Sequence, residues 1–220
     1  MNQAKRIEIL TRLREQNPHP TTELEYNSPF ELLIAVILSA QATDKGVNKA
    51  TAKLFPVANT PQAILDLGLE GLKEYIKTIG LYNSKAENII KTCRDLFEKH
   101  NGEVPENREA LEALAGVGRK TANVVRGNWY HIPSVVVDTH VKRVSNLLGL
   151  TKNEDPVKIE FDLMQLVPKD KWIDINTQMI AHGRKICIAR RPKCQECFLL
   201  PYCTGGKALE KEKKKKEKKA

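Results

Sequence analysis

Apolar residues recur at intervals of three and four along most of the chain, the spacing that places them on one face of an α-helix. The pattern predicts helices over residues 3–15, 46–55, 69–79, 84–99, 107–113, 119–130, 139–149, 156–167 and 171–186. The alternation typical of strands is nearly absent, and the best strand candidate, Val135 to Val137, is too short to make a sheet. We therefore expect an all-α protein.

Several helix starts carry strong local signals. Residues 28–31, Ser-Pro-Phe-Glu, combine an N-cap serine, a proline at the first helical position and a glutamate at the third, which together form a capping box. Thr60-Pro61 and Asp155-Pro156 repeat the cap followed by proline. The helix after Ser28 is apolar on almost every face, which predicts a central helix surrounded by others.

Length and composition fit a folded globular protein. The 220 residues allow one large domain or two small lobes, and 41% apolar with 29% charged residues is ordinary for such a chain. The longest apolar run, Leu32 to Leu38, has seven residues, far fewer than the ~20 that cross a bilayer. The first ten residues lack the apolar core of a secretory signal. We expect no membrane attachment and a cytoplasmic location, where cysteines stay reduced.

The net charge of +9 favours a polyanionic partner without identifying it. Residues 207–220 contribute eight lysines and three glutamates, so this segment supplies +5 and the rest of the chain +4. The segment is either a disordered solubilising tail or an arm that binds nucleic acid. We expect residues 208–220 to be a disordered tail.

A short internal repeat relates residues 78–90 to residues 114–125. With one residue inserted after Tyr82, a glycine, a lysine, an asparagine and an aliphatic pair coincide. Both segments have the pattern helix, glycine turn, helix, and either chance or common geometry explains the match. If the geometry is shared, residues 81–83 form a second loop on the same face as the first.

Four of the five cysteines are spaced by six, two and five residues: Cys187, Cys194, Cys197 and Cys203. In a reduced compartment this spacing indicates a metal site rather than disulfides. Structural zinc sites usually pair two Cys-x-x-Cys knuckles, whereas one knuckle with wider loops on both sides favours a cubane [4Fe-4S] cluster. Zinc and unliganded core cysteines are the alternatives. Cys93 lies on an apolar helical face and is most simply a small buried hydrophobe.

The loop between the first two of these cysteines is strongly basic. It carries Arg190, Arg191 and Lys193. Four thiolates leave a cubane cluster net negative, so these cations either balance the cluster or face a phosphate backbone.

Residues 114–125, LAGVGRKTANVV, place two glycines before a helix that begins near Arg119. Gly116 and Gly118 let backbone N–H groups approach a ligand, and a helix N-terminus attracts phosphate. The alternative is a plain turn whose glycines supply positive φ. Lys120 favours the functional interpretation, because a cation in a first helical turn lies at the disfavoured end of the helix dipole. The alternative, which would be favoured for a lone lysine, is an exposed side chain that costs about a few tenths of a kcal/mol. That potential favours the uncharged amine, which is the nucleophilic form.

Asp138, in residues 135–144, follows a short apolar run and precedes a helix. Its simplest role is an N-cap worth about 1 kcal/mol. A carboxylate held in this way also suits the stabilisation of a cationic transition state, and the sequence does not separate the two roles.

Together, LAGVGRKTANVV, VDTHVKRV, SAQATD and the four-cysteine loop resemble the endonuclease III family, the iron–sulfur DNA glycosylases of the helix–hairpin–helix superfamily. The resemblance covers residues 1–203. It implies a six-helix barrel over residues 23–132, with the helix–hairpin–helix at about 107–130. It also implies a cluster lobe built from residues 1–22 and 133–207, with a DNA cleft between the two lobes.

The resemblance assigns roles to individual residues. It implies Lys120 as the nucleophile, Asp138 as the catalytic carboxylate, and the four cysteines as ligands of a [4Fe-4S] cluster. It also implies that Gln41 and Leu81 fill the space left by a flipped base. Two departures stand out: Ala115 replaces the usual hairpin proline, and residues 126–128, Arg-Gly-Asn, place a glycine inside the second hairpin helix at a cost of about 1 kcal/mol.

The resemblance implies a monomeric, nucleoid-associated bifunctional DNA glycosylase and abasic-site lyase. Its substrate would be double-stranded DNA with an oxidised pyrimidine or an abasic site, and its work would be base excision repair. One alternative is a mismatch adenine glycosylase; those relatives generally lack the hairpin lysine and carry a further C-terminal domain. The other is a non-catalytic DNA-binding module clipped by zinc.

Overall fold

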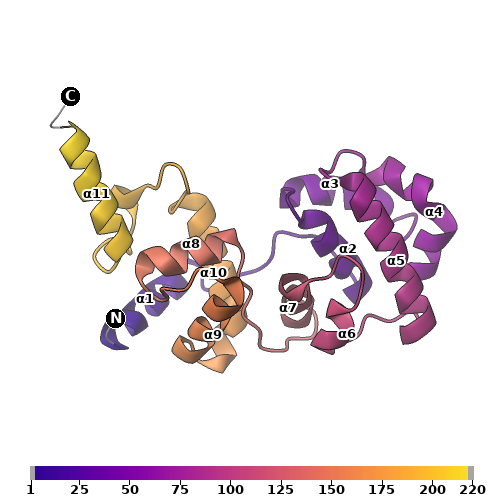
Figure 1. The fold of residues 1–220 in the computed structure, drawn as a ribbon, viewed down its shortest axis with the longest axis horizontal. Helices are drawn as coiled ribbons and strands as arrows, with labels where there is room; N and C mark the ends of the chain where they lie inside the picture. Colours follow the sequence, from indigo (N-terminus) through magenta and orange to yellow (C-terminus); the bar gives the residue numbers. More distant parts are fainter. Residues whose placement is uncertain (1–2, 218–220) are drawn as a thin grey trace. The chain divides into compact units, whose positions relative to one another are not determined.

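The structure, a computed structural model, describes residues 3–217, with side chains as far as Lys211 (Figure 1). Within this range the regular elements are helices and no strand is present, so the expected all-α class is confirmed. The segment at Val135 and Val136 is buried but is not assigned as a β-strand in the described chain. None of the described helices is long and apolar enough to cross a membrane.

The chain forms two compact units, each with its own hydrophobic core. One unit comprises Thr22–Ile132, and the other combines Met1–Thr21 with Pro133–Ala220. We refer to them as the middle unit and the terminal unit.

The middle unit holds six α-helices. They are α2 (Pro29–Ser39), α3 (Asp44–Leu54), α4 (Pro61–Ile76), α5 (Tyr82–His100), α6 (Arg108–Glu112) and α7 (Arg119–Asn128). In Figure 1, α4 and α5 lie side by side, and α2 packs against α3, α5 and α7. The helix that the sequence predicted to be central is therefore surrounded.

Helix α2 is buried from Phe30 to Leu38. Its N-terminus is satisfied locally, because Ser28 Oγ accepts from Glu31 N at 3.1 Å and Glu31 Oε2 accepts from Asn27 N at 2.6 Å. This is a variant of the predicted capping box in which the glutamate reaches the residue before the N-cap. The buried Glu31 carboxylate thus serves the chain that leads into the helix.

Helix α4 contains a break. Gly68 has φ 74° and ψ 172°, outside the helical region, so residues 61–67 and 69–76 form two helical segments. Glycine adopts this positive φ at little steric cost. The sequence predicted a helix start at Thr60 and a separate helix over residues 69–79, which agrees with the break at Gly68.

The terminal unit begins with α1 (Gln3–Gln16) and resumes with α8 (Thr139–Leu148), α9 (Pro156–Leu166), α10 (Trp172–Lys185) and α11 (Thr204–Glu217). Short 3-10 helices occupy Lys169–Lys171 and Cys194–Glu196. Helix α10 packs against both α1 and α8. The core of this unit therefore joins the N-terminal helix to the C-terminal half of the chain.

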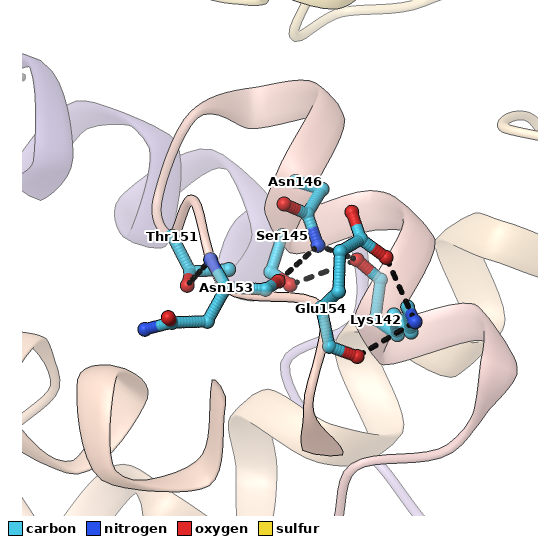
Figure 2. A network of polar contacts seen from close by, with 6 residues as sticks. All are labelled: Lys142, Ser145, Asn146, Thr151, Asn153 and Glu154. Atoms are coloured by element: carbon cyan, nitrogen blue, oxygen red, sulfur yellow. Dashed lines mark hydrogen bonds and ion pairs between the residues drawn. The ribbon is translucent and has the colours of Figure 1, made fainter. Parts of the chain in front are cut away.

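A polar network fixes the loop between α8 and α9 (Figure 2). Asn146 Nδ2 donates to the carbonyls of Lys142 and Asn153, both at 3.1 Å. Lys142 Nζ donates to the Glu154 carbonyl at 2.7 Å and pairs with the Glu154 carboxylate at 2.8 Å. The loop is thus held against α8, because its carbonyls find partners on that helix.

The sequence predicted a disordered tail over residues 208–220, but α11 is helical through Glu217. Residues 218–220 lie outside the described range. Lysine and glutamate are good helix formers, and the alternating charges of this segment suit a helix. Gln195 Nε2 also donates to Glu210 Oε2 at 3.3 Å, which links α11 to the cysteine loop.

The α2 cap generates a stability prediction. Ser28→Ala removes the acceptor for Glu31 N and is expected to lower the free energy of unfolding by about 1 kcal/mol. Ser28→Asp keeps an acceptor and should lose much less. Urea unfolding followed by circular dichroism measures both, and equal losses in the two variants would contradict the capping role.

Candidate active site and metal centre

The hairpin between α6 and α7 is anchored by two buried side chains, Leu114 and Val117. Asn107 caps α6, since its Oδ1 accepts from Ala110 N at 2.9 Å. Thr92 of α5 donates through Oγ1 to the Ala115 carbonyl at 2.8 Å. This bond holds the turn at the position where related hairpins carry proline, so a hydrogen bond from α5 contributes to its rigidity.

The two hairpin glycines differ in their surroundings. Gly116 has φ 75°, and a Cβ there would lie 3.0 Å from Asn88 Cβ. Gly118 has φ −97°, which any residue adopts, and a Cβ there would meet nothing within 4 Å. The fold therefore requires glycine at 116 but not at 118, where the open space leaves the backbone accessible to a ligand.

Lys120 lies in the first turn of α7 with its side chain exposed. Its helix begins at Gly118 without a side-chain cap hydrogen bond. An uncapped N-terminus offers N–H groups to an anion at the positive end of the helix dipole. Lys120 therefore lies beside an uncapped helix N-terminus.

The polar residues inside α7 have local partners. Gly127 is buried, Asn128 Nδ2 donates to the Val124 carbonyl at 2.9 Å, and Arg126 Nε donates to the Glu106 carbonyl at 3.2 Å. Helix α7 packs against α2 and α6. The glycine that interrupts this helix in the sequence is thus at a buried position.

Gln41 and Leu81 share an unusual backbone conformation. Both have positive φ, 54° for Gln41 and 60° for Leu81, and both side chains are exposed. Positive φ is uncommon for residues other than glycine, asparagine and aspartate, and typically marks functional strain. A Cβ on Gly80 would lie 3.7 Å from the Gln41 carbonyl oxygen, so the two loops are neighbours. The structure brings these two predicted residues together on the middle unit.

Asp138 is the N-cap of α8, as its sequence position predicted. Its Oδ1 accepts from Val141 N at 2.8 Å, and the side chain is half-buried. One carboxylate oxygen is therefore used by the helix. Burial lowers the pKa of nearby His140, and the Asp138 charge partly opposes that shift.

Helix α8 is fastened to the cysteine loop at two levels. The Arg143 guanidinium donates to the Cys187 carbonyl at 3.1 and 2.8 Å and to the Gly183 carbonyl at 3.1 Å. Near the helix C-terminus, Thr204 Oγ1 donates to the Leu147 carbonyl at 3.3 Å. The loop that carries the cysteines thus supports the helix that carries Asp138.

The four predicted ligand cysteines line one cavity, together with Leu148, His182 and Gly206. Among the described residues, no three His, Cys, Asp or Glu side chains converge closely enough to hold a single ion. The thiols instead surround a shared space, which suits a polynuclear cluster bound at its separate corners. A donor set of four thiols around one cavity fits an iron–sulfur cluster.

The cavity also has features suited to bound thiolates. Gly206 N donates to Cys203 Sγ at 3.1 Å, and a Cβ on Gly206 would lie at the same distance from that sulfur. Burial raises the pKa of the Cys187 thiol, while Arg143 opposes that shift. Buried thiolates need a positive partner, and the irons of a cluster supply it.

His182 and Cys93 take structural positions. Burial lowers the pKa of His182 to about 4, and its ring packs edge-on against Phe198 with centroids 5.2 Å apart. Burial also raises the pKa of Cys93 to about 12, which keeps it a protonated thiol in the core of the middle unit. Cys93 thus matches its predicted role as a small buried hydrophobe.

The basic loop is exposed at Arg190, Arg191 and Lys193. Lys193 Nζ lies 4.0 Å from Glu196 Oε2 in a weak surface pair. These cations are therefore accessible to a phosphate backbone, which was one of the two expected roles.

The sequence indicated no role for Arg143, and Lys85 entered only as the lysine of the internal repeat over residues 78–90. Lys85 is buried, and its Nζ donates to the carbonyls of Leu38 and Ala40, so it is engaged rather than available for attack. The position of Lys85 on the apolar face of a predicted helix was the one feature of the sequence that could have indicated its burial. Arg143 carried none, because its partners lie 40 and 44 residues away.

Comparison with known families gives matches over both units. Residues 34–169 match the HhH-GPD superfamily base excision DNA repair protein model, and residues 187–203 match the iron-sulfur binding domain of endonuclease III. The second match spans the four cysteines and no further residues on either side.

Individual relatives are similar over nearly the whole chain. Endonuclease III of Haemophilus influenzae is 71% identical over 210 residues, covering 96% of this chain and 100% of the relative. Endonuclease III of Escherichia coli K12 is 63% identical over 203 residues, covering 92% and 96%.

Two solved structures are also similar at 43% identity, each covering 96% of this chain and 99% of the solved one. A non-covalent endonuclease III–DNA complex has a TM-score of 0.93. A trapped endonuclease III–DNA covalent intermediate, an estranged-adenine complex, has a TM-score of 0.92.

The cavity generates a prediction about metal binding. Cys197→Ser removes one of four thiols, so the purified protein should lose its visible iron–sulfur absorption and unfold at a lower temperature, since metal binding and folding are coupled. Cys93→Ser is the control, because it changes a buried thiol outside the cavity and should keep the absorption. Unchanged absorption and unfolding in Cys197→Ser would remove Cys197 from the ligand set.

Proposed function

The chain belongs to the endonuclease III family, and on that premise we propose that it is a bifunctional DNA glycosylase and abasic-site lyase that removes oxidised pyrimidines in base excision repair. The observation that carries this function is Lys120 in the uncapped first turn of α7, next to the open backbone at Gly118. A lysine in this position supplies an amine beside a bound phosphate backbone. The covalent DNA intermediate of a similar protein supports an enzyme that forms a bond to its substrate.

Lys120 is the proposed nucleophile. Its uncharged amine attacks C1′ of the damaged nucleotide, and the bond from C1′ to the base breaks, so that the base leaves with the bonding electrons and takes up a proton. Loss of the amine proton and opening of the sugar ring give a Schiff base. Removal of a proton from C2′ then expels the 3′ phosphate, and water hydrolyses the imine to release the lysine.

Asp138 is proposed to stabilise the positive charge that develops on the sugar and to assist proton transfer. The structure supports a fixed carboxylate, because one oxygen is held by Val141 N and the helix is held by Arg143. A preorganised charge needs little rearrangement as the transition state forms. Its role as an N-cap and its role in catalysis are compatible, since the second oxygen is not needed by that cap bond.

The damaged base is buried in the DNA stack and must be flipped out before it reacts. We propose that Gln41 and Leu81 occupy the vacated space. Their exposure and their neighbouring positions in strained backbone support this assignment, because a wedge must project and must be formed before it meets DNA. An exposed leucine also loses its contact with water when it enters the stack.

Binding to the backbone is assigned to two elements. The hairpin at Gly116 and Gly118 is proposed to offer N–H groups to phosphate, and Arg190, Arg191 and Lys193 to offer charge. Contacts of this kind are independent of base sequence and weaken as salt rises. They suit an enzyme that must search DNA of any sequence for rare lesions.

The chain carries a [4Fe-4S] cluster, and we propose that Cys187, Cys194, Cys197 and Cys203 hold it. The cluster would supply the positive charge that lets four thiolates share one cavity, and the proposed base removal has no step on it. The loop that it organises positions Arg143 and the basic side chains. Its proposed role is therefore to fix the terminal unit.

The partner is DNA that contains a damaged base or an abasic site. We propose that one copy of the chain suffices, because the nucleophile, the carboxylate, the wedge residues and the ligand cysteines all occur in this one sequence. Its proposed place of work is the nucleoid, where its substrate lies.

Borohydride trapping tests the nucleophile. Lys120→Gln keeps a side chain of similar length without an amine, so it should still bind lesion DNA but give no cross-link and almost no strand cleavage. Asp138→Asn should bind and react far more slowly. Measurement uses a duplex with one oxidised thymine, resolved on denaturing gels.

Lys53→Gln is the matched control, since Lys53 is exposed on α3, and it should be trapped like the unmodified protein. Undiminished trapping in Lys120→Gln would transfer the nucleophile to another amine. It would also leave the hairpin as a binding element only.

The hairpin glycines generate a paired prediction. Gly118→Ala should leave the unfolding midpoint nearly unchanged but weaken binding to abasic-site DNA, because a Cβ there occupies ligand space. Gly116→Ala should lower the free energy of unfolding by about 1–2 kcal/mol, because the added Cβ meets Asn88 at positive φ. Chemical unfolding and fluorescence anisotropy separate these effects, and full affinity in Gly118→Ala would show that DNA does not approach that backbone.

A further inference from the structure

Lys85 is a buried cation in the first turn of α5, with 5% of its surface exposed. Burying a charge is unfavourable unless the charge is well hydrogen-bonded. Burial lowers the pKa of Lys85, which is consistent with that cost. The residue therefore occupies this position for a reason other than core packing.

The partners of Lys85 are at the end of α2. Its Nζ donates to the Leu38 carbonyl at 2.9 Å and to the Ala40 carbonyl at 2.6 Å. The last carbonyls of a helix have no partner within the helix, and cations are favoured at that end of the dipole. Lys85 thus caps the C-terminus of the central helix from a neighbouring helix.

This cap acts directly on the backbone of Gln41. The Ala40 carbonyl lies in the same peptide plane as Gln41 N. The φ angle of Gln41 is the rotation of this plane about the N–Cα bond of Gln41. Holding the carbonyl therefore fixes one side of the rotation. Gln41 has φ 54°, and the carbonyl of the residue before it accepts this hydrogen bond.

The same residue also acts on Leu81. Lys85 N donates to the Leu81 carbonyl at 3.1 Å and closes the first turn of α5, whose N-cap is Leu81 at φ 60°. The adjacent Gly80 lies beside the Gln41 carbonyl. One lysine thus contacts the backbone of both strained loops, through its amide on one side and its ammonium on the other.

We propose that Lys85 is a positioning residue that holds Gln41 and Leu81 in their left-handed conformations, ready to enter the duplex. This inference rests on the wedge role proposed above. With the ammonium in place, the conformation of Gln41 is present in the free protein beside Leu81, so DNA binding does not have to create it. Without it, the carbonyls of Leu38 and Ala40 lose this partner and the Gln41 loop relaxes.

The internal repeat of residues 78–90 and 114–125 places one lysine in each loop. Lys85 and Lys120 occupy matching places after a glycine turn, but Lys120 is exposed and Lys85 is directed into the core. The shared geometry places a lysine in the first turn of a helix in both loops. Lys120 would attack the sugar, and Lys85 would hold the backbone beside the residues that fill the gap in the duplex.

The test compares duplex with single-stranded substrate. A single strand carrying the same oxidised thymine has no opposite base and no gap to fill, so the wedge is not needed. Lys85→Met should lower kcat/KM on the duplex by about tenfold, the factor expected when one strained residue is no longer preorganised. The same variant should change kcat/KM on the single strand less than about twofold, relative to the unmodified protein.

Lys91→Met is the matched control, because Lys91 is exposed on the same helix, and it should leave both substrates unaffected. In a background of Gln41→Ala and Leu81→Ala, Lys85→Met should cause no further loss on the duplex, since residues that act through one another are not additive. Lys85→Gln keeps an N–H donor without the charge and should show a smaller loss of the same kind. Lys85→Gln also replaces Lys85→Met in this test if Lys85→Met does not fold.

Equal losses on duplex and single strand would overturn the proposal, because a fold or chemistry defect has that signature. An unchanged duplex rate in both Lys85 variants would overturn it as well. If the unmodified protein acts on neither substrate, the proposed function fails and this inference falls with it, a result distinct from a selective Lys85 effect.

Discussion

The middle unit depends on the complete burial of α2. A helix that is apolar on nearly every face gains free energy from burial all round, but its end groups then need partners within the protein. Ser28 and Glu31 serve the N-terminus and Lys85 the C-terminus. The functional loops follow from this arrangement, because Gln41 emerges where α2 ends and α7 packs against its side. Residues that project toward a ligand are therefore positioned by the least accessible helix of the unit.

In the terminal unit, Asp138 is the N-cap of α8, a helix of ten residues. Short helices have little stability of their own and rely on tertiary contacts. Arg143 and Thr204 join α8 to the cysteine loop, and the network of Figure 2 joins it to the following loop. Asp138 is thus fixed by contacts made well away from it.

Local signals made much of this fold predictable. Proline after a capping residue marked the starts of α2, α4 and α9, and the glycines at 116 and 118 marked the hairpin before α7. The cysteine spacing predicted the cluster because all four ligands lie in one short segment. Partnerships between distant residues were not predictable: Lys85 bonds carbonyls 45 and 47 residues away, and nothing near it in sequence indicates them. The sequence did not predict α11, because its many lysines indicated a disordered tail although lysine and glutamate also favour helix.

The two hairpin glycines would affect a cell in different ways. A change at Gly116 acts on the folded state, and a destabilised protein is removed by proteases, so its abundance falls. A change at Gly118 leaves the fold intact, so the protein would accumulate at normal levels while failing at its task. Protein abundance would therefore report damage at one glycine and conceal it at the other.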